Sequence, residues 1–108
     1  MRQHSLKRRK RMARNKNIYK FKFNGKEYKL FFATSRELPD RHGDCDSPEV
    51  DGRKIRVHYK LVGERKLKVL IHEMLHAEDF EISEKVVTRI AREIARALRK
   101  LGVVFKDE

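Results

Sequence analysis

The chain contains 108 residues, carries a formal net charge of +12 and has a single cysteine, Cys45. This length fits one domain with a modest core, and one cysteine excludes an intrachain disulfide. No stretch is long and apolar enough for a membrane span or for the core of a secretory signal, so we expect a soluble cytoplasmic protein.

Residues 1–17 are predicted to form a basic N-terminal arm that precedes a domain of residues 18–108. The arm contains eight Lys or Arg and neither Asp nor Glu. Such a block of charge contacts nucleic-acid phosphates in some proteins and is a solubilising tail in others. Both interpretations stay open, and the first makes DNA or RNA a candidate partner.

Two segments of alternating apolar and polar residues, 18–23 and 26–32, flank Asn24 and Gly25. Asn and Gly tolerate the positive φ angles of a type I′ turn, so this stretch predicts a β-hairpin. The lysines between the apolar residues should face water. The side chains expected to face the core are Tyr19, Phe21, Phe23, Tyr28, Leu30 and Phe32.

Residues 33–53 contain two Pro and two Gly, which favours a loop with turns. The next segment, residues 54–60, predicts a third strand, because Ile55, Val57 and Tyr59, expected to face the core, alternate with polar residues expected to face outward. We expect this strand to lie at the edge of the sheet, where an extended peptide could pair with it.

Two helices are predicted after the third strand. The first, over about residues 64–79, is apolar around most of its circumference, which indicates a largely buried helix. The second begins after Ser83, a typical N-cap residue, and ends near Leu101, where Gly102 is a typical stop. This order predicts an α+β fold in which a small antiparallel sheet, a hairpin plus an edge strand, packs on two helices.

The first predicted helix carries His72 and His76, with Glu73 directly after the first histidine. Residues four apart share a helix face and lie about 6 Å apart along the axis, so both imidazoles can bind one ion at about 2.1 Å. Glu73 points to the side of the pair, where its carboxylate could take a proton from a zinc-activated water. This His-Glu-x-x-His pattern is the metalloprotease signature, and the alternative is two histidines satisfied by neighbouring groups.

A catalytic zinc ion needs a third protein ligand. Glu84 is our preferred candidate, because a tight turn between the helices could bring its carboxylate over the histidines. Asp79 is the alternative, although it lies about 10 Å from His72 along the axis and the helix would need to bend. Cys45 could also approach the metal, but a buried inert thiol is a commoner role for a free cysteine.

Residues 42–102 resemble small zincin-like proteins of phages and some bacteria, most specifically in LIHEMLHAEDFEISEKVV at 70–87 and in GDCD at 43–46. The chain is similar, more loosely, to SprT-like metallopeptidase domains, which act near DNA. The resemblance implies a minimal zincin-like fold, with Zn²⁺ bound by His72, His76 and Glu84 and with Glu73 as general base. It also implies a location in a bacterial host cell or a virion. The basic arm and the aromatic hairpin lie outside the resembling pattern.

A stripe of four arginines is predicted along the second helix, at Arg89, Arg92, Arg96 and Arg99. The stripe suits a polyanion or an acidic partner, although a solvated helix face is the commoner interpretation.

Two functional hypotheses follow from these patterns. The first is a zinc metallopeptidase that hydrolyses bonds in a peptide or protein substrate. The second is a nucleic-acid-associated or virion structural protein with a structural or vestigial zinc site. A structural site is closed by four protein ligands, whereas a catalytic site has three and leaves a position for water, so the ligand count separates them.

Overall fold

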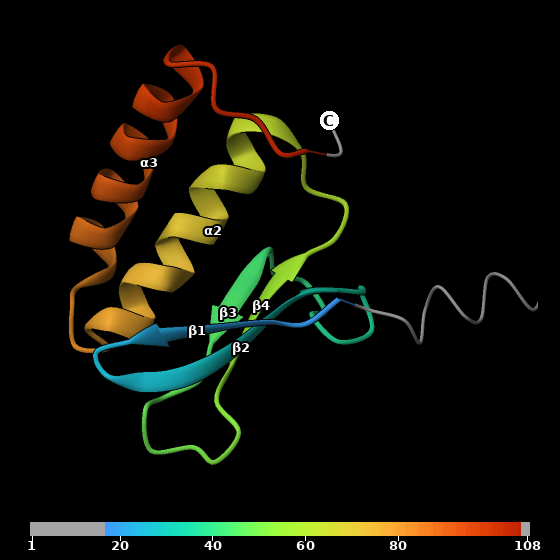
Figure 1. The fold of residues 1–108 in the computed structure, drawn as a ribbon, viewed down its shortest axis with the longest axis vertical. Helices are drawn as coiled ribbons and strands as arrows, with labels where there is room; N and C mark the ends of the chain where they lie inside the picture. Colours follow the sequence, from blue (N-terminus) through green and yellow to red (C-terminus); the bar gives the residue numbers. More distant parts are fainter. Residues whose placement is uncertain (1–16, 107–108) are drawn as a thin grey trace, which may run out of the picture.

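A computed structural model of the chain describes residues 17–106. Figure 1 shows α2 lying over one face of a small sheet, with α3 beside α2. The predicted α+β architecture of a small sheet packed on two helices is confirmed. The predicted basic arm lies, apart from Asn17, outside the described residues. The elements are β1 (Tyr19–Phe23), β2 (Lys26–Ala33), β3 (Gly43–Cys45), β4 (Lys54–His58), α2 (Gly63–Glu78) and α3 (Glu84–Lys100).

The sheet is mixed rather than antiparallel, and its strand order is β1-β2-β4-β3. β1 and β2 form the predicted antiparallel hairpin, but β4 runs parallel to β2, with Leu30 opposite Ile55. The prediction of a purely antiparallel sheet was therefore wrong. The physical reason is the long connection of residues 34–53, which allows the chain to return to the start of the sheet before β4 begins.

β4 occupies an interior position, which corrects its predicted place at the edge. The segment predicted to be only loop contains β3, whose residues Gly43, Asp44 and Cys45 pair antiparallel with the outer side of β4. A strand of three residues with a glycine and an aspartate has no alternating apolar pattern, so periodicity gave no sign of it. The edge strands of the described sheet are β1 and β3.

The hairpin turn has the predicted conformation, because Asn24 and Gly25 have φ angles of 52° and 75°. Both values lie in the left-handed region that a type I′ turn requires at its two central residues. The turn is also tied to the end of α2, since the Asn24 backbone N–H donates a hydrogen bond of 2.9 Å to Glu78 Oε1. This bond holds the hairpin against the helix that carries the two histidines.

The main core lies between the sheet and α2. It consists of Tyr28, Leu30, Ile55, Val57 and Ala77, all buried. A second cluster covers the end of the opposite sheet face, where Leu38 of the connection packs with Phe31 and Ala33.

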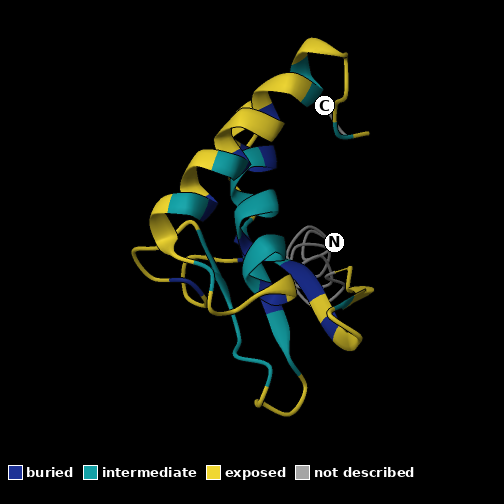
Figure 2. Ribbon diagram, turned by 90° about the vertical axis from the view of Figure 1, so that its left-hand side faces the viewer, coloured by how far each residue is buried: buried dark blue, intermediate teal, exposed yellow. Residues whose placement is uncertain are grey.

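Three residues predicted to face the core are exposed instead. Tyr19 and Phe21 of the edge strand β1 are 39% and 41% exposed, and Tyr59 lies beyond the end of β4 at 53%. Phe23 and Phe32 are half-buried around the core. Figure 2 shows buried segments where the sheet meets α2 and also along α3, whose residues Val87, Ala91 and Ala95 are fully buried. The alternating pattern identified which face of β1 points toward the core. It did not predict how much of that face is buried, which depends on how far α2 extends over the sheet.

Both helices begin and end close to the predicted positions. Ser83 caps α3, since its Oγ accepts a hydrogen bond of 3.2 Å from the Val86 backbone N–H. At the other end Gly102 has a φ of 88°, and Val103 N–H donates to Leu98 O at 3.0 Å, as in a Schellman motif. The apolar side chains of α2 are largely half-buried, so that helix is less enclosed than predicted. Neither helix among residues 17–106 is long and apolar enough to cross a membrane.

Candidate metal centre

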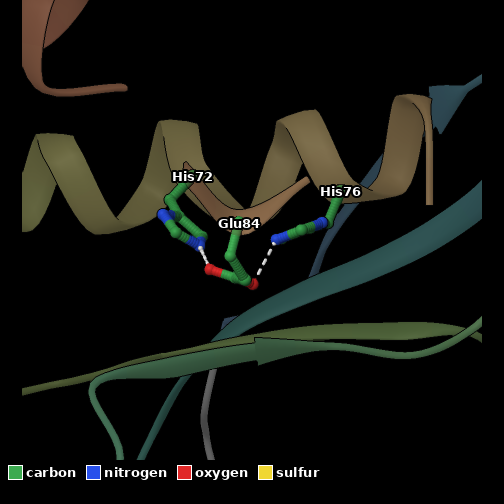
Figure 3. A group of neighbouring side chains, drawn as sticks. All are labelled: His72, His76 and Glu84. Carbon is green, nitrogen blue, oxygen red and sulfur yellow. Dashed lines mark hydrogen bonds and ion pairs between the residues drawn. The ribbon is translucent and has the colours of Figure 1, made fainter. Parts of the chain in front are cut away.

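His72 and His76 lie one turn apart on the same face of α2. Their ring centroids are 5.0 Å apart, with an angle of 60° between the ring planes. Figure 3 shows both rings leaving α2 on the same side, with Glu84 between them. The pairing follows directly from the helical period, because residues four apart are neighbours on a helix surface.

Glu84 reaches the histidines from the first turn of α3. Its Oε1 lies 3.1 Å from His72 Nε2, and its Oε2 lies 2.8 Å from His76 Nε2. The short connection between the helices makes this reach possible. Two hydrogen bonds to Asp79 shape the backbone of this connection. The Glu81 N–H donates to Asp79 Oδ1, and the Ile82 N–H donates to the Asp79 carbonyl oxygen.

We call this triad the His-His-Glu group. Each residue offers one ligand atom, and the three atoms all lie within 4.8 Å of one another. Ligand atoms about 2.1 Å from a tetrahedral zinc ion are about 3.4 Å apart. Small side-chain rotations would therefore suffice for His72, His76 and Glu84 to surround one ion. Two imidazole nitrogens and a carboxylate oxygen also form a donor set that zinc prefers, so the residues fit the metal.

The two candidates for the third ligand occupy different places. Glu84 belongs to the His-His-Glu group, whereas Asp79 does not. Asp79 is the C-cap of α2, and its Oδ1 accepts a hydrogen bond of 3.2 Å from the Glu81 backbone N–H. Asp79 thus shapes the turn that delivers Glu84.

One side of the His-His-Glu group is open to solvent. The side chains of His72 and His76 are 20% and 13% exposed, while that of Glu84 is 73% exposed. Burial is the main cause that lowers the pKa of His72, opposed by the negative charge of Glu84. A lowered pKa favours the neutral imidazole, which is the form that binds metal ions.

Glu73 is buried beside the group, with only 8% of its surface exposed. Burial raises the pKa of its carboxyl to about 8, and the negative charges of Asp44 and Glu84 add to this effect. Arg41 acts in the opposite direction. A bound divalent cation would favour the ionised carboxylate, because its positive charge stabilises a nearby anion.

Gly43 of β3 lies at a close approach between the sheet edge and α2. A Cβ atom at this position would lie 2.8 Å from Val69 Cγ1, 3.0 Å from Arg56 O and 3.2 Å from Glu73 Cγ. The absence of a side chain therefore lets β3 pack against the helix segment that carries Glu73. Sequence reasoning noticed the GDCD segment but did not find this role, which depends on a non-local contact.

Cys45 is not part of the His-His-Glu group. Burial, followed by the charge of Glu73, raises the pKa of its thiol to about 12. Its Sγ donates a hydrogen bond of 3.4 Å to Asp46 O. These properties describe a protonated, weakly reactive thiol that lies outside the His-His-Glu group.

The arginine stripe begins near Glu84, the candidate for the third ligand. A shallow hollow of about 450 Å³ on α3 is lined by Glu84, Lys85, Thr88, Arg89 and Arg92. Arg89 also lies 3.8 Å from Glu93 one turn further along. The hollow therefore has cationic side chains beside the open side of the His-His-Glu group.

Comparison of the chain with protein-family models, curated proteins and solved structures finds no match.

Proposed function

We propose that the chain is a minimal zinc metallopeptidase. The observation that carries this proposal is the convergence of His72, His76 and Glu84 from two helices, with one ligand atom of each within 4.8 Å of the others. A glutamate directly after the first histidine adds the acid–base group that peptide hydrolysis requires.

A zinc ion held by the His-His-Glu group would supply Lewis acidity, which polarises a carbonyl and lowers the pKa of water toward about 7. His72 and His76 would hold the metal through Nε2, and Glu84 would balance part of its charge. Glu73 would accept a proton from the attacking water and pass it to the leaving amine. The burial of Glu73 keeps its carboxylate in a low-dielectric surrounding, where its interaction with the reacting groups is strong.

The substrate strand is assigned to β3 instead of the interior strand β4. β3 is the edge strand that packs against α2, and Gly43 lies next to Glu73. Its outer side can pair with an extended peptide through backbone hydrogen bonds, and such pairing would place a peptide bond beside the histidines. We therefore expect extended or unfolded peptide segments as substrates.

The number of protein ligands favours catalysis over a structural zinc site. Three His or Glu side chains converge among residues 17–106, and the exposed face of Glu84 leaves room for water. A structural site would need a fourth protein ligand. The alternative of a nucleic-acid-associated or virion structural protein therefore predicts a site closed by a further residue.

The decisive experiment separates metal binding from catalysis. His72→Ala should abolish zinc binding, while Glu73→Gln should retain about one zinc per chain and lose hydrolysis of unfolded casein. His42→Ala, a histidine outside the His-His-Glu group, is the matched control and should retain both properties. Hydrolysis that survives in Glu73→Gln would exclude Glu73 as the base. Zinc-loaded wild-type protein without hydrolysis would favour the structural alternative.

A further inference from the structure

Three lysines lie side by side across three adjacent strands of the sheet. In the β1–β2 register Lys20 is opposite Lys29, and in the β2–β4 register Lys29 is opposite Lys54. Neighbouring strands are about 4.8 Å apart, so the row of three spans about 10 Å at the backbone. We call Lys20, Lys29 and Lys54 the lysine row.

The lysine row projects from the sheet face opposite the helices. Side chains alternate between the two faces of a strand, and Leu30 and Ile55 are in the core beneath α2. Their neighbours Lys29 and Lys54 therefore project from the other face. Lys20 and Lys29 are exposed, and Lys54 is half-buried. Figure 1 shows both helices on the far side of the sheet from this face.

The juxtaposition is unfavourable for the isolated chain, because like charges directly opposite one another on a sheet destabilise the pairing. Among residues 17–106 none of the three ammonium groups forms an ion pair. Glu27 lies on the same face opposite Lys22, and the carboxylate of Asp46, beside Lys54, is bonded to other groups. Asp46 Oδ1 binds Arg56 at 3.3 Å, and Asp46 Oδ2 accepts from the Lys54 backbone N–H at 3.0 Å.

We propose that the lysine row binds the phosphate backbone of a nucleic-acid duplex. Phosphates would relieve the repulsion within the row, and each lysine that meets a phosphate releases a condensed counterion. In the sequence, the arm of residues 1–17, which carries eight Lys or Arg, precedes β1, the strand that contains Lys20. This site is separate from the His-His-Glu group and does not depend on metal.

Two observations favour a duplex over the other polyanionic surfaces. Single-stranded nucleic acids are bound largely by stacking of bases on aromatic side chains, and no aromatic residue belongs to the row. Insertion into an anionic membrane needs exposed apolar side chains. Phe31, the next residue after Lys29 on the same face, is 7% exposed and packs with Leu38.

The test compares two triple variants of the full chain. Lys20→Gln/Lys29→Gln/Lys54→Gln removes the row, while Lys60→Gln/Lys85→Gln/Lys100→Gln removes three exposed lysines outside the sheet. Binding to a fluorescent 20-base-pair DNA duplex is measured by anisotropy over a series of NaCl concentrations. The plot of log binding constant against log salt concentration has a negative slope. The magnitude of this slope should decrease by about 3 for the row variant, about 1 per lysine, and should be unchanged for the control.

Two further measurements guard against an effect of misfolding. Lys20→Arg/Lys29→Arg/Lys54→Arg keeps the charges and should retain the wild-type slope. Lys29→Gln alone should raise the melting temperature at low salt by about 2–5 °C, because it removes the repulsion on both sides of the central lysine, while it weakens duplex binding. Equal slopes for the two Gln triples would overturn the proposal. So would a loss of binding confined to phosphatidylserine vesicles, with duplex binding unchanged.

Discussion

Glu84 Oε2 lies 2.8 Å from His76 Nε2, although a helix end and a turn separate the two residues along the chain. The contact brings a carboxylate from the start of α3 over a histidine of α2. Together with the contact of 3.1 Å to His72, it turns a helical motif into a three-residue group suited to zinc. The functional interpretation therefore depends on the geometry of the helix connection.

The first prediction concerns the choice between Glu84 and Asp79 as the third ligand. Glu84→Ala should weaken zinc binding by about 100-fold or more, because it removes one of three ligands. Asp79→Ala should change the affinity far less, since the Asp79 carboxylate accepts a backbone bond in the turn. Competition with a chromogenic zinc chelator measures both affinities. An equal loss in the two variants would contradict the assignment of Glu84.

The second prediction concerns the cap that positions Glu84. Ser83→Ala removes the hydrogen bond to the Val86 N–H and should lower the free energy of unfolding by about 1 kcal/mol. Because Glu84 directly follows the cap, zinc affinity should also fall. Ser83→Asp, which can cap the same helix end, should restore stability. Urea unfolding of the metal-free protein provides the measurement, and Ser83→Ala with unchanged stability would exclude this role of the cap.

The third prediction tests the close approach of β3 to α2. Gly43→Ala should lower the free energy of unfolding by about 1–3 kcal/mol, since its Cβ would overlap with Val69 Cγ1 at 2.8 Å. Hydrolytic activity should fall as well, because the new Cβ atom would also lie 3.2 Å from Glu73 Cγ.

The control for Gly43→Ala is a double-mutant cycle with Val69→Ala. Removal of the valine methyl groups should relieve part of the overlap, so the double variant should be less destabilised than the sum of the single variants. Additive effects would mean that the valine contact does not limit the approach.

The fourth prediction is a dependence of stability on pH that arises from Cys45. The pKa of its thiol is raised to about 12 in the folded chain, above an ordinary value near 8.5, so the folded state retains a proton that the unfolded state loses. This contribution is complete below about pH 8.5 and is lost as the pH rises toward 12. The loss should approach at most about 1.4 kcal/mol per pH unit in that window.

The comparison for Cys45 is with Cys45→Ala, in which all other titratable groups are retained. Between pH 8.5 and 10 the wild-type chain should lose more free energy of unfolding than this variant. Native Cys45 should also react with iodoacetamide much more slowly than free cysteine at pH 8.5, because little thiolate is present. Rapid alkylation of the folded chain would contradict the raised pKa.

Several features of the fold were predictable because they depend on neighbours in the chain. Asn24 and Gly25 specify their turn through their own φ preferences, and Ser83 and Gly102 mark the ends of α3 through backbone bonds within a few residues. His72 and His76 share a face because the helical period places them there. The sequence left Glu84 and Asp79 as alternatives for the third ligand, because a turn of a few residues can follow several backbone paths.

The amino-acid sequence by itself determined the hairpin, both helices and the pair of histidines, because each arises from local backbone preferences and side-chain periodicity. Only the tertiary structure decided the parallel pairing of β2 with β4, the edge position of β3, and Glu84 rather than Asp79 beside the histidines. It also aligned Lys20, Lys29 and Lys54 in one row. Strand pairing joins residues far apart in the chain, and its register is set by how the whole sheet packs against α2, which no local pattern encodes.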